Sequence, residues 1–254
     1  MNSIQHAQNL LSEIGWESPS DFTLLEIANY LNINIKEVPI SGSQGRILIN
    51  GNSAIITIDS GLTHEGKKNF VIAHEIGHFL MHKNLISIFS DTEKTLSDWH
   101  TKGPHENEAN SFATELLMPF DAFKSFINKN KLSLNLIEKV SEYFNTSLLA
   151  TFLRYVDIGD FPAMVVYMEN NKIIWKKYSH DFPLTFLNIG SQVPEYTVAG
   201  DYFTRGNREE KPEKIEAIEW FANDFNIKYN KNLILWEQCY KVSSKGLISC
   251  IWTE

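Results

Sequence analysis

Cysteine is scarce in this sequence. The 254 residues contain two, Cys239 and Cys250, both late in the chain. Two cysteines are too few for the disulfide framework of a small secreted protein, and they exclude a zinc site built on several thiolates. A reducing compartment is therefore the expected environment, and no metal site is expected to rest on cysteine.

The sequence also lacks long apolar runs and an excess of positive charge. No apolar stretch reaches membrane-spanning length, and the first residues lack the basic segment and apolar core of a secretion signal. The formal net charge of −8 argues against a broad nucleic-acid-binding surface. With 43% hydrophobic and 21% charged residues, the composition is that of an ordinary globular protein. We expect a cytoplasmic protein with no membrane partner and no direct nucleic-acid partner.

The most informative stretch is His74-Glu75-Ile76-Gly77-His78. Apolar residues flank it at helical spacing, which predicts a helix of about five turns from near His64 to near Lys83. Two histidines four residues apart lie on one face of a helix, so both imidazoles can bind one ion, and zinc prefers such ligands. Glu75 stands where the zinc-protease signature has its general base. Burying these polar side chains in an apolar segment is costly without a metal. The pattern predicts a catalytic zinc site.

A second predicted helix, residues 105–117, opens after Pro104 and stops before Met118-Pro119. A catalytic zinc usually has three protein ligands, and Glu106 lies about 50° from the centre of the apolar face of this helix. His105 lies about as close on the other side, so helical phase leaves both residues open. A first-turn carboxylate such as Glu106 would also suit the helix dipole without any metal. His82 is a weaker candidate, because it lies about 12 Å along the helix from His74.

Together, the two segments closely resemble the ImmA/IrrE family of bacterial and phage metallopeptidases. The resemblance rests on His-Glu-Ile-Gly-His and on the downstream Glu-Asn-Glu-Ala-Asn-Ser-Phe-Ala-Thr-Glu-Leu-Leu-Met-Pro. It extends less specifically to about Arg154 and covers a little over half of the chain. It implies Zn2+ as the cofactor, His74, His78 and Glu106 as the metal ligands, and Glu75 as the catalytic glutamate. The resemblance thereby selects Glu106 over His105 as third ligand.

The resemblance implies a regulatory zinc endopeptidase whose substrate is a helix-turn-helix transcriptional repressor in a stress response or mobile-element switch. No repressor-like DNA-binding domain is recognisable in the sequence, so we expect a separately encoded partner. The oxyanion-stabilising residue is predicted to be His105, or a tyrosine or arginine that the sequence does not place. Two alternatives remain: a zinc-containing binding or sensor protein that controls a repressor without cutting it, and a DNA-binding regulator that uses residues 22–38 or 135–158.

The predicted fold class is α+β, in two domains. Residues 1–159 are expected to form a zincin-like, mostly helical metallopeptidase domain with a small β-sheet. Further helices are predicted near residues 3–15 and 22–31, and strands at 46–50 and 54–59 are joined by an Asn-Gly-Asn hairpin. The strand at 54–59 is either an edge that pairs with an extended peptide or an ordinary strand of the sheet, and the sequence does not separate the two. The polar stretch 84–103 is a candidate lid loop.

Residues 160–254 are expected to form a smaller α+β domain with an antiparallel sheet. Strands are predicted at 163–169, 172–178, 233–237 and 247–252, with a hairpin at Asn170-Asn171 and a helix at 215–225. This part of the sequence carries no metal, phosphate or nucleophile motif. A sensor, substrate-selecting or dimerisation role is as compatible with it as plain structural support.

Overall fold

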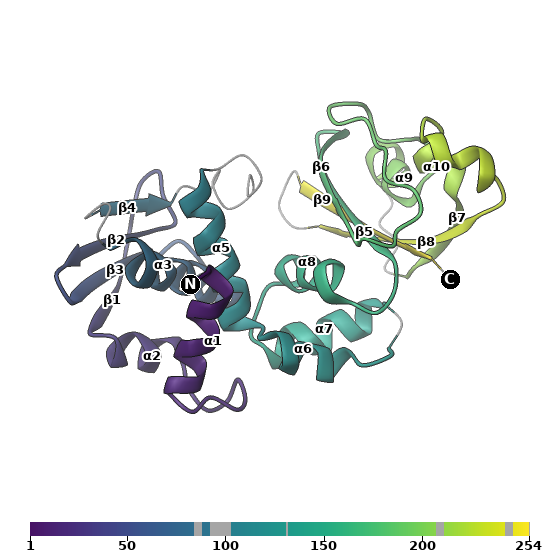
Figure 1. Ribbon diagram of the computed structural model, residues 1–254. Helices are drawn as coiled ribbons and strands as arrows, with labels where there is room; N and C mark the ends of the chain where they lie inside the picture. The colour runs from purple at the N-terminus through teal and green to yellow at the C-terminus, as the bar shows by residue number, and fades with distance from the viewer. Residues whose placement is uncertain (84–87, 92–102, 131, 207–210, 242–245, 254) are drawn as a thin grey trace. The chain divides into compact units, whose positions relative to one another are not determined.

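The chain folds into two compact units, each with its own β-sheet. The computed structural model describes residues 1–83, 88–91, 103–130, 132–206, 211–241 and 246–253, with the backbone alone for 88–91. The first unit comprises residues 1–123 and 141–147, and the second comprises 124–140 and 148–254. Figure 1 follows the chain through both units. Two α+β parts, the first mostly helical around a small sheet and the second around an antiparallel sheet, confirm the predicted fold class.

The sheet of the first unit has four strands in the order β1-β3-β2-β4. They are β1 (Ile33–Val38), β2 (Gly45–Asn50), β3 (Ser53–Asp59) and β4 (Ile88–Asp91). Buried and exposed residues alternate along β2, as expected for a strand with one face on the core. The predicted hairpin is confirmed, since β2 and β3 pair antiparallel from Asn50↔Ser53 onwards. Of the predicted lid at 84–103, β4 and residue 103 are described, and the rest lies outside the described residues.

The structure contradicts two alternatives that the sequence left open here. The strand at 54–59 is no edge, because β3 pairs with β1 on one side and β2 on the other. Residues 22–38 are no helix-turn-helix either, because helix α2 (Leu24–Tyr30) runs into strand β1, which lies parallel to β3. Asn32, with φ 58°, ends the helical path between them, since the left-handed region breaks a right-handed helix and tolerates asparagine. Ile33 then enters the core from the strand.

Helices cover the core-facing side of this sheet. They are α1 (Ser3–Glu13), α2, α3 (Glu65–His82) and α5 (Pro104–Leu117). α3 packs on β2 and β3, α5 packs along α3, and α1 lies on α5, as Figure 1 shows. The core between them is formed by aliphatic side chains of the sheet and apolar side chains of α3 and α5, among them Ile47, Ile56, Ile76 and Phe112. The predicted helices at 64–83 and 105–117 are confirmed within about a residue at each end.

Three helices follow α5: α6 (Phe120–Ile127), α7 (Leu134–Tyr143) and α8 (Leu148–Ile158). Phe152 of α8 packs against Tyr240, with ring centroids 5.1 Å apart, and both residues belong to the second unit. Residues 124–140 and 148–159 therefore group with the second unit, whereas the sequence assigned them to the first domain. The domain boundary near residue 160 stays a prediction.

The second unit contains a five-stranded antiparallel sheet in the order β6-β5-β9-β8-β7. Its strands are β5 (Ala163–Glu169), β6 (Lys172–Tyr178), β7 (Glu213–Glu216), β8 (Ile234–Lys241) and β9 (Gly246–Thr253). The predicted β5–β6 hairpin turns at Asn170 and Asn171, both with positive φ, as a tight hairpin turn requires. The last strand in sequence, β9, lies in the middle of the sheet between β5 and β8.

Shorter helices cover this second sheet. They are α9 (Val198–Arg205), α10 (Ala217–Phe221) and the 3-10 helix η1 (Phe225–Tyr229). The single helix predicted at 215–225 is wrong, because residues 213–216 pair as strand β7 and the helical turn ends at Phe221. Asp224 stops it: the buried Asp224 carboxylate accepts hydrogen bonds from the backbone N–H groups of Thr185 and Phe186. The sequence did not predict α9. The backbone N–H groups of Val198 and Ala199, at its start, donate hydrogen bonds to the buried Glu237 carboxylate.

None of the helices in the described part of the chain combines the length and the apolar character that crossing a membrane requires.

Candidate metal centre

Two glycines set the position of α3. A Cβ atom on Gly77 would lie 3.0 Å from Cδ1 of Phe112 in α5, so the missing side chain allows the two helices to pack closely. A Cβ atom on Gly45, at the start of β2, would lie 2.3 Å from Cγ1 of Val71. Helix α3 is thus held between the sheet and α5 without room for a methyl group at either contact.

The structure brings together the three metal ligands predicted from the sequence. Nε2 of His74 lies 3.0 Å from Nε2 of His78, one turn further along α3. Each of these nitrogens lies 3.3 Å from a carboxylate oxygen of Glu106 at the start of α5. His74 and His78 are buried, and the Glu106 side chain is 27% exposed, so the donors converge at the inner end of a partly open site.

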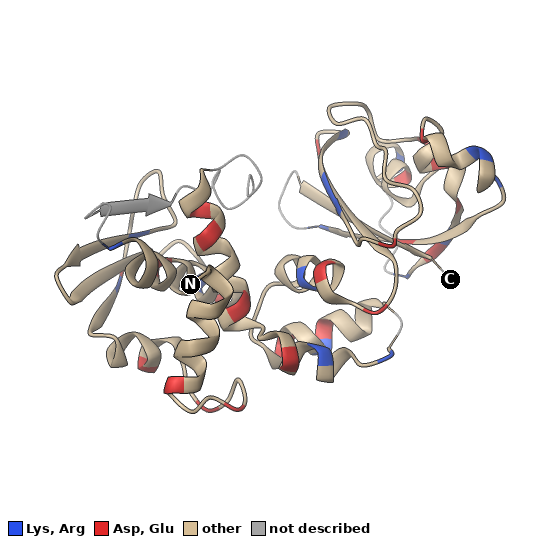
Figure 2. Ribbon diagram, viewed as in Figure 1, with Lys and Arg blue, Asp and Glu red and all other residues tan. Residues whose placement is uncertain are grey.

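These distances fit a tetrahedral metal ion. Ligands bound at about 2.0–2.1 Å in a tetrahedron lie about 3.3 Å from one another. Here the two Nε2 atoms lie 3.0 Å apart, and they lie 3.3 Å from Oε2 and Oε1 of Glu106 respectively. Two neutral imidazoles and one carboxylate are a donor set that suits zinc and leaves one position for water or substrate. Figure 2 shows acidic and no basic residues on α5, which makes its surroundings favourable for a cation. The residues present therefore fit the metal.

Each histidine of the site has a partner for its other ring nitrogen. Nδ1 of His74 lies 2.9 Å from the amide oxygen of Asn110 in α5. Nδ1 of His78 lies 3.0 Å from Nδ1 of His82, in the last turn of α3. Such contacts fix the orientation and tautomer of a metal-binding imidazole so that Nε2 presents its lone pair. The sequence suggests His82 only as a possible metal ligand and gives no separate role to Asn110.

The local electrostatics favour the forms that bind a metal. Burial lowers the pKa of His78, and the neighbouring His74 and His82 lower it further against the opposing effect of Glu106, which keeps the imidazole neutral. Burial alone would raise the pKa of Glu106, but hydrogen bonds from His74 and His78, with a smaller electrostatic contribution from the same two rings, outweigh it and hold this pKa well below the usual glutamate range. The carboxylate is therefore ionised over the whole physiological range.

Glu75 lies on α3 beside the first ligand and is 1% exposed. Its carboxylate approaches the start of β2: Oε1 lies 3.2 Å from where a Cβ atom on Gly45 would be. A carboxylate next to the donor triad is the arrangement that general-base catalysis needs, because the base must reach the water that attacks the substrate.

Residues 28–154, half of the chain, match the sequence profile of peptidase family M78, described as the IrrE N-terminal-like domain. The chain belongs to the M78 family. The matched segment contains the donor triad, Glu75, Asn110 and His82. M78 membership confirms the resemblance seen in the motifs, and it makes the chain a member of a family of peptidases.

Curated relatives agree with the M78 assignment. The chain is 31% identical over 116 residues to metallopeptidase ImmA of Bacillus subtilis (strain 168), covering 44% of this chain and 60% of the relative. It is 34% identical over 95 residues to an uncharacterized immunity region protein 2 of Bacillus phage phi105, covering 37% and 57%. The chain thus spans a little under two thirds of the length of these relatives.

A solved structure shares the fold over almost the whole chain. It is a Mycobacterium tuberculosis transcriptional regulator with a TM-score of 0.62 and 14% sequence identity, and the match covers 99% of this chain and 75% of that one. At this identity the likeness establishes the fold alone.

His105 lies on α5, directly before the candidate metal ligand Glu106. Its side chain is 48% exposed, and its Nδ1 lies 3.4 Å from Oε2 of Glu108. Its ring packs 4.7 Å from the ring of His82. The oxyanion-stabilising role predicted for His105 stays a prediction.

Proposed function

We propose that this M78 chain is a zinc-dependent endopeptidase that hydrolyses a peptide bond in a partner protein, a separately encoded helix-turn-helix repressor in a stress or mobile-element switch. The observation that carries the proposal is the donor triad of His74, His78 and Glu106 with Glu75 buried beside it. Similarity to a metallopeptidase and to a phage immunity-region protein supports the enzyme class and the regulatory setting. A cytoplasmic location follows from that setting.

Each residue of the site has a chemical task in this proposal. Zinc held by the triad would supply Lewis-acid polarisation of the scissile carbonyl and would lower the pKa of water at the open position. Glu75 takes the proton from the attacking water and delivers it to the leaving amine, the two roles of a single general acid–base residue. Asn110 and His82 keep the two ligand imidazoles oriented. His105 is the proposed donor to the developing oxyanion.

The decisive variant is Glu75→Gln, which keeps the size of the side chain and removes its basicity. We expect it to retain zinc and to lose cleavage of the partner, because general acid–base catalysis contributes about 10²–10⁴-fold to rate. The assay combines the metal content of the purified protein with electrophoresis of a candidate helix-turn-helix repressor incubated with it. Glu65→Gln, at the exposed start of the same helix, is the matched control and should cleave normally.

Two results would contradict the proposal. Cleavage at the wild-type rate by Glu75→Gln would remove this residue from the mechanism. Release of the repressor from DNA without any cut, requiring stoichiometric protein and equal in wild type and Glu75→Gln, would favour the alternative of a zinc-containing binding protein.

A further inference from the structure

A second group of metal-binding side chains lies at the C-terminal end of α3, one turn beyond His78. It consists of His82, His105 and Glu108, here called the second cluster. Nε2 of His82 lies 2.9 Å from Oε2 of Glu108, and Nδ1 of His105 lies 3.4 Å from the same oxygen. The three donor atoms all lie within 4.8 Å of one another, and the donor set, two imidazoles and one carboxylate, is the same as in the first triad.

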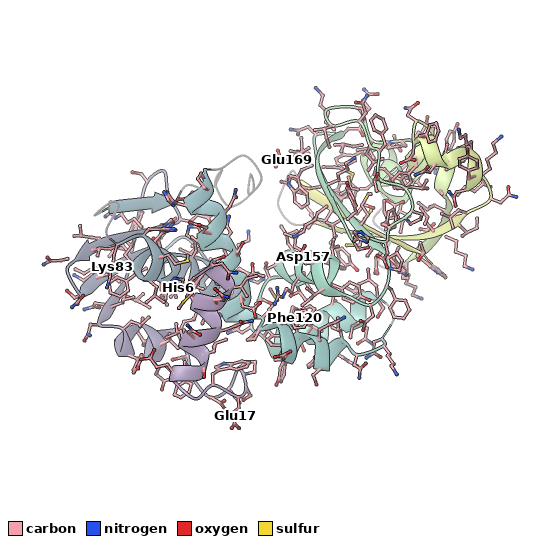
Figure 3. All side chains as sticks on the ribbon, in the orientation of Figure 1. His6, Glu17, Lys83, Phe120, Asp157 and Glu169 are labelled. Carbon is pink, nitrogen blue, oxygen red and sulfur yellow. The ribbon has the colours of Figure 1, made fainter. Side chains whose placement is uncertain are left out.

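The second cluster is anchored on one side and open on the other. His82 is 2% exposed and therefore held in place by the packing of α3. The side chains of His105 and Glu108 are 48% and 52% exposed, so an ion can approach from solvent and complete its coordination with water. Figure 3 labels Lys83, the residue after His82, and so marks the end of α3 that contributes to this cluster.

We propose that His82, His105 and Glu108 bind a second divalent metal ion, zinc by donor type, more weakly than the first site does. Imidazole and carboxylate donors at this spacing suit zinc, and three protein ligands with open positions are enough to hold it. The inference goes beyond the proposed peptidase function and does not rest on it, since metal binding is measured whether or not any peptide is cut.

The contact between His78 and His82 couples the two sites. Their Nδ1 atoms lie 3.0 Å apart, so in a hydrogen bond one carries the proton and the other accepts it. When His78 uses Nε2 as a ligand, its proton is on Nδ1 and is donated to Nδ1 of His82. His82 then carries its own proton on Nε2 and donates it to Glu108.

An ion at the second cluster takes Nε2 of His82 and moves the ring proton of His82 to Nδ1. Two N–H groups would then face each other at the 3.0 Å contact, and His78 would lose the acceptor that orients it. Loss of such a partner typically weakens metal binding by about 10–100-fold. Because coupling between sites is reciprocal, the second ion is expected to bind about 10–100-fold more weakly when the first is present, and to loosen the first in return.

The test is a titration of metal-free protein with zinc, followed by calorimetry and by competition with a chelator of known affinity. Because the two sites have the same donor set, the coupling sets the difference between them, and the wild type is expected to bind one ion tightly and a second about 10–100-fold more weakly than the first. Glu108→Gln and His105→Ala are expected to lose the second ion and keep the first. The Gln amide oxygen of the first variant still accepts the hydrogen bond from His82. Glu65→Gln removes the same charge from the other end of α3 and should bind as the wild type does.

Two outcomes would overturn the second site. One is a single ion in the wild type at zinc concentrations on the order of a hundredfold above the first dissociation constant. The other is a weak ion that persists in both Glu108→Gln and His105→Ala, which would belong elsewhere on the chain. Failure of the peptidase proposal looks different, because it leaves both ions bound and the partner uncut.

Discussion

Asn110 is predicted to control how tightly the first site holds its metal. Its amide oxygen accepts the hydrogen bond from Nδ1–H of His74 at 2.9 Å. Asn110→Ala removes that acceptor from a fully buried imidazole whose orientation is fixed once Nε2 binds a metal. Metal-free protein is affected less, because no metal ion then depends on the orientation of the ring. Asn110→Ala therefore destabilises the zinc-bound protein more than the metal-free protein, and this difference lowers the affinity for zinc.

The expected loss is about 10–100-fold in the zinc dissociation constant, the usual effect of removing a hydrogen-bond partner from a metal-binding histidine. This corresponds to about 1.4–2.8 kcal/mol of binding free energy. The same range follows from leaving one buried donor without its acceptor, about 1–3 kcal/mol.

The assay is competition for zinc between the protein and a fluorescent chelator, with the fold of each variant checked by circular dichroism. Asn110→Asp keeps an acceptor at the same position and should retain or raise the affinity. Ser111→Ala is the matched control on α5, because the Ser111 hydroxyl bonds only a local carbonyl on the exposed face. An Asn110→Ala affinity within about twofold of the wild type would refute the reasoning, since it would fall well short of the tenfold minimum.

Two further predictions concern stability. Gly45→Ala places a methyl group 2.3 Å from Val71 and 3.2 Å from Glu75, so it is expected to destabilise the first unit by about 1–3 kcal/mol in urea unfolding; a gain in stability would mean that β2 has more room than the structure gives it. For Glu237, burial raises the pKa of the carboxyl against the opposing hydrogen bonds from Ser249 and α9. The folded state then binds this proton more tightly than the unfolded state, so the free energy of unfolding should fall as pH rises above about 4.3, and Glu237→Gln should lack this decline. If the free energy of unfolding changed with pH in the same way in the wild type and in Glu237→Gln, the raised pKa assigned to Glu237 would be contradicted.

The sequence was sufficient to predict that His74 and His78 lie on one face of α3. The spacing of His74 and His78 is a property of one helix, so periodicity alone places both rings together. The partner on α5 was harder to identify. Helical phase left His105 and Glu106 equivalent, and the family motif decided between them. In the structure Glu106 contacts both histidines, whereas His105 points to Glu108.

What the sequence missed depends on contacts between distant segments. The sequence does not show that Asn110 contacts His74, because this contact forms only when α3 packs against α5. Strand β1 has only one turn of irregular chain between it and α2, and its pairing with β3 is visible only once the sheet is formed. The start of α9 has a local signal, since the Thr197 hydroxyl accepts a hydrogen bond from the Gly200 N–H, and it is also stabilised by Glu237, 39 residues from Val198 along the chain, a contact that the sequence does not show. Local patterns predict elements, and tertiary contacts decide their ends and partners.

The place of β9 in the second sheet has a consequence for how this unit is made. During synthesis, β5 and β6 can form their hairpin early, and β7 can pair with β8 as soon as both have left the ribosome. Neither pair can join the other, because the strand between them, Gly246–Thr253, is the last of the five to emerge. Until then β5 and β8 each present an unpaired edge, the kind of surface that chaperones protect and that invites wrong pairing.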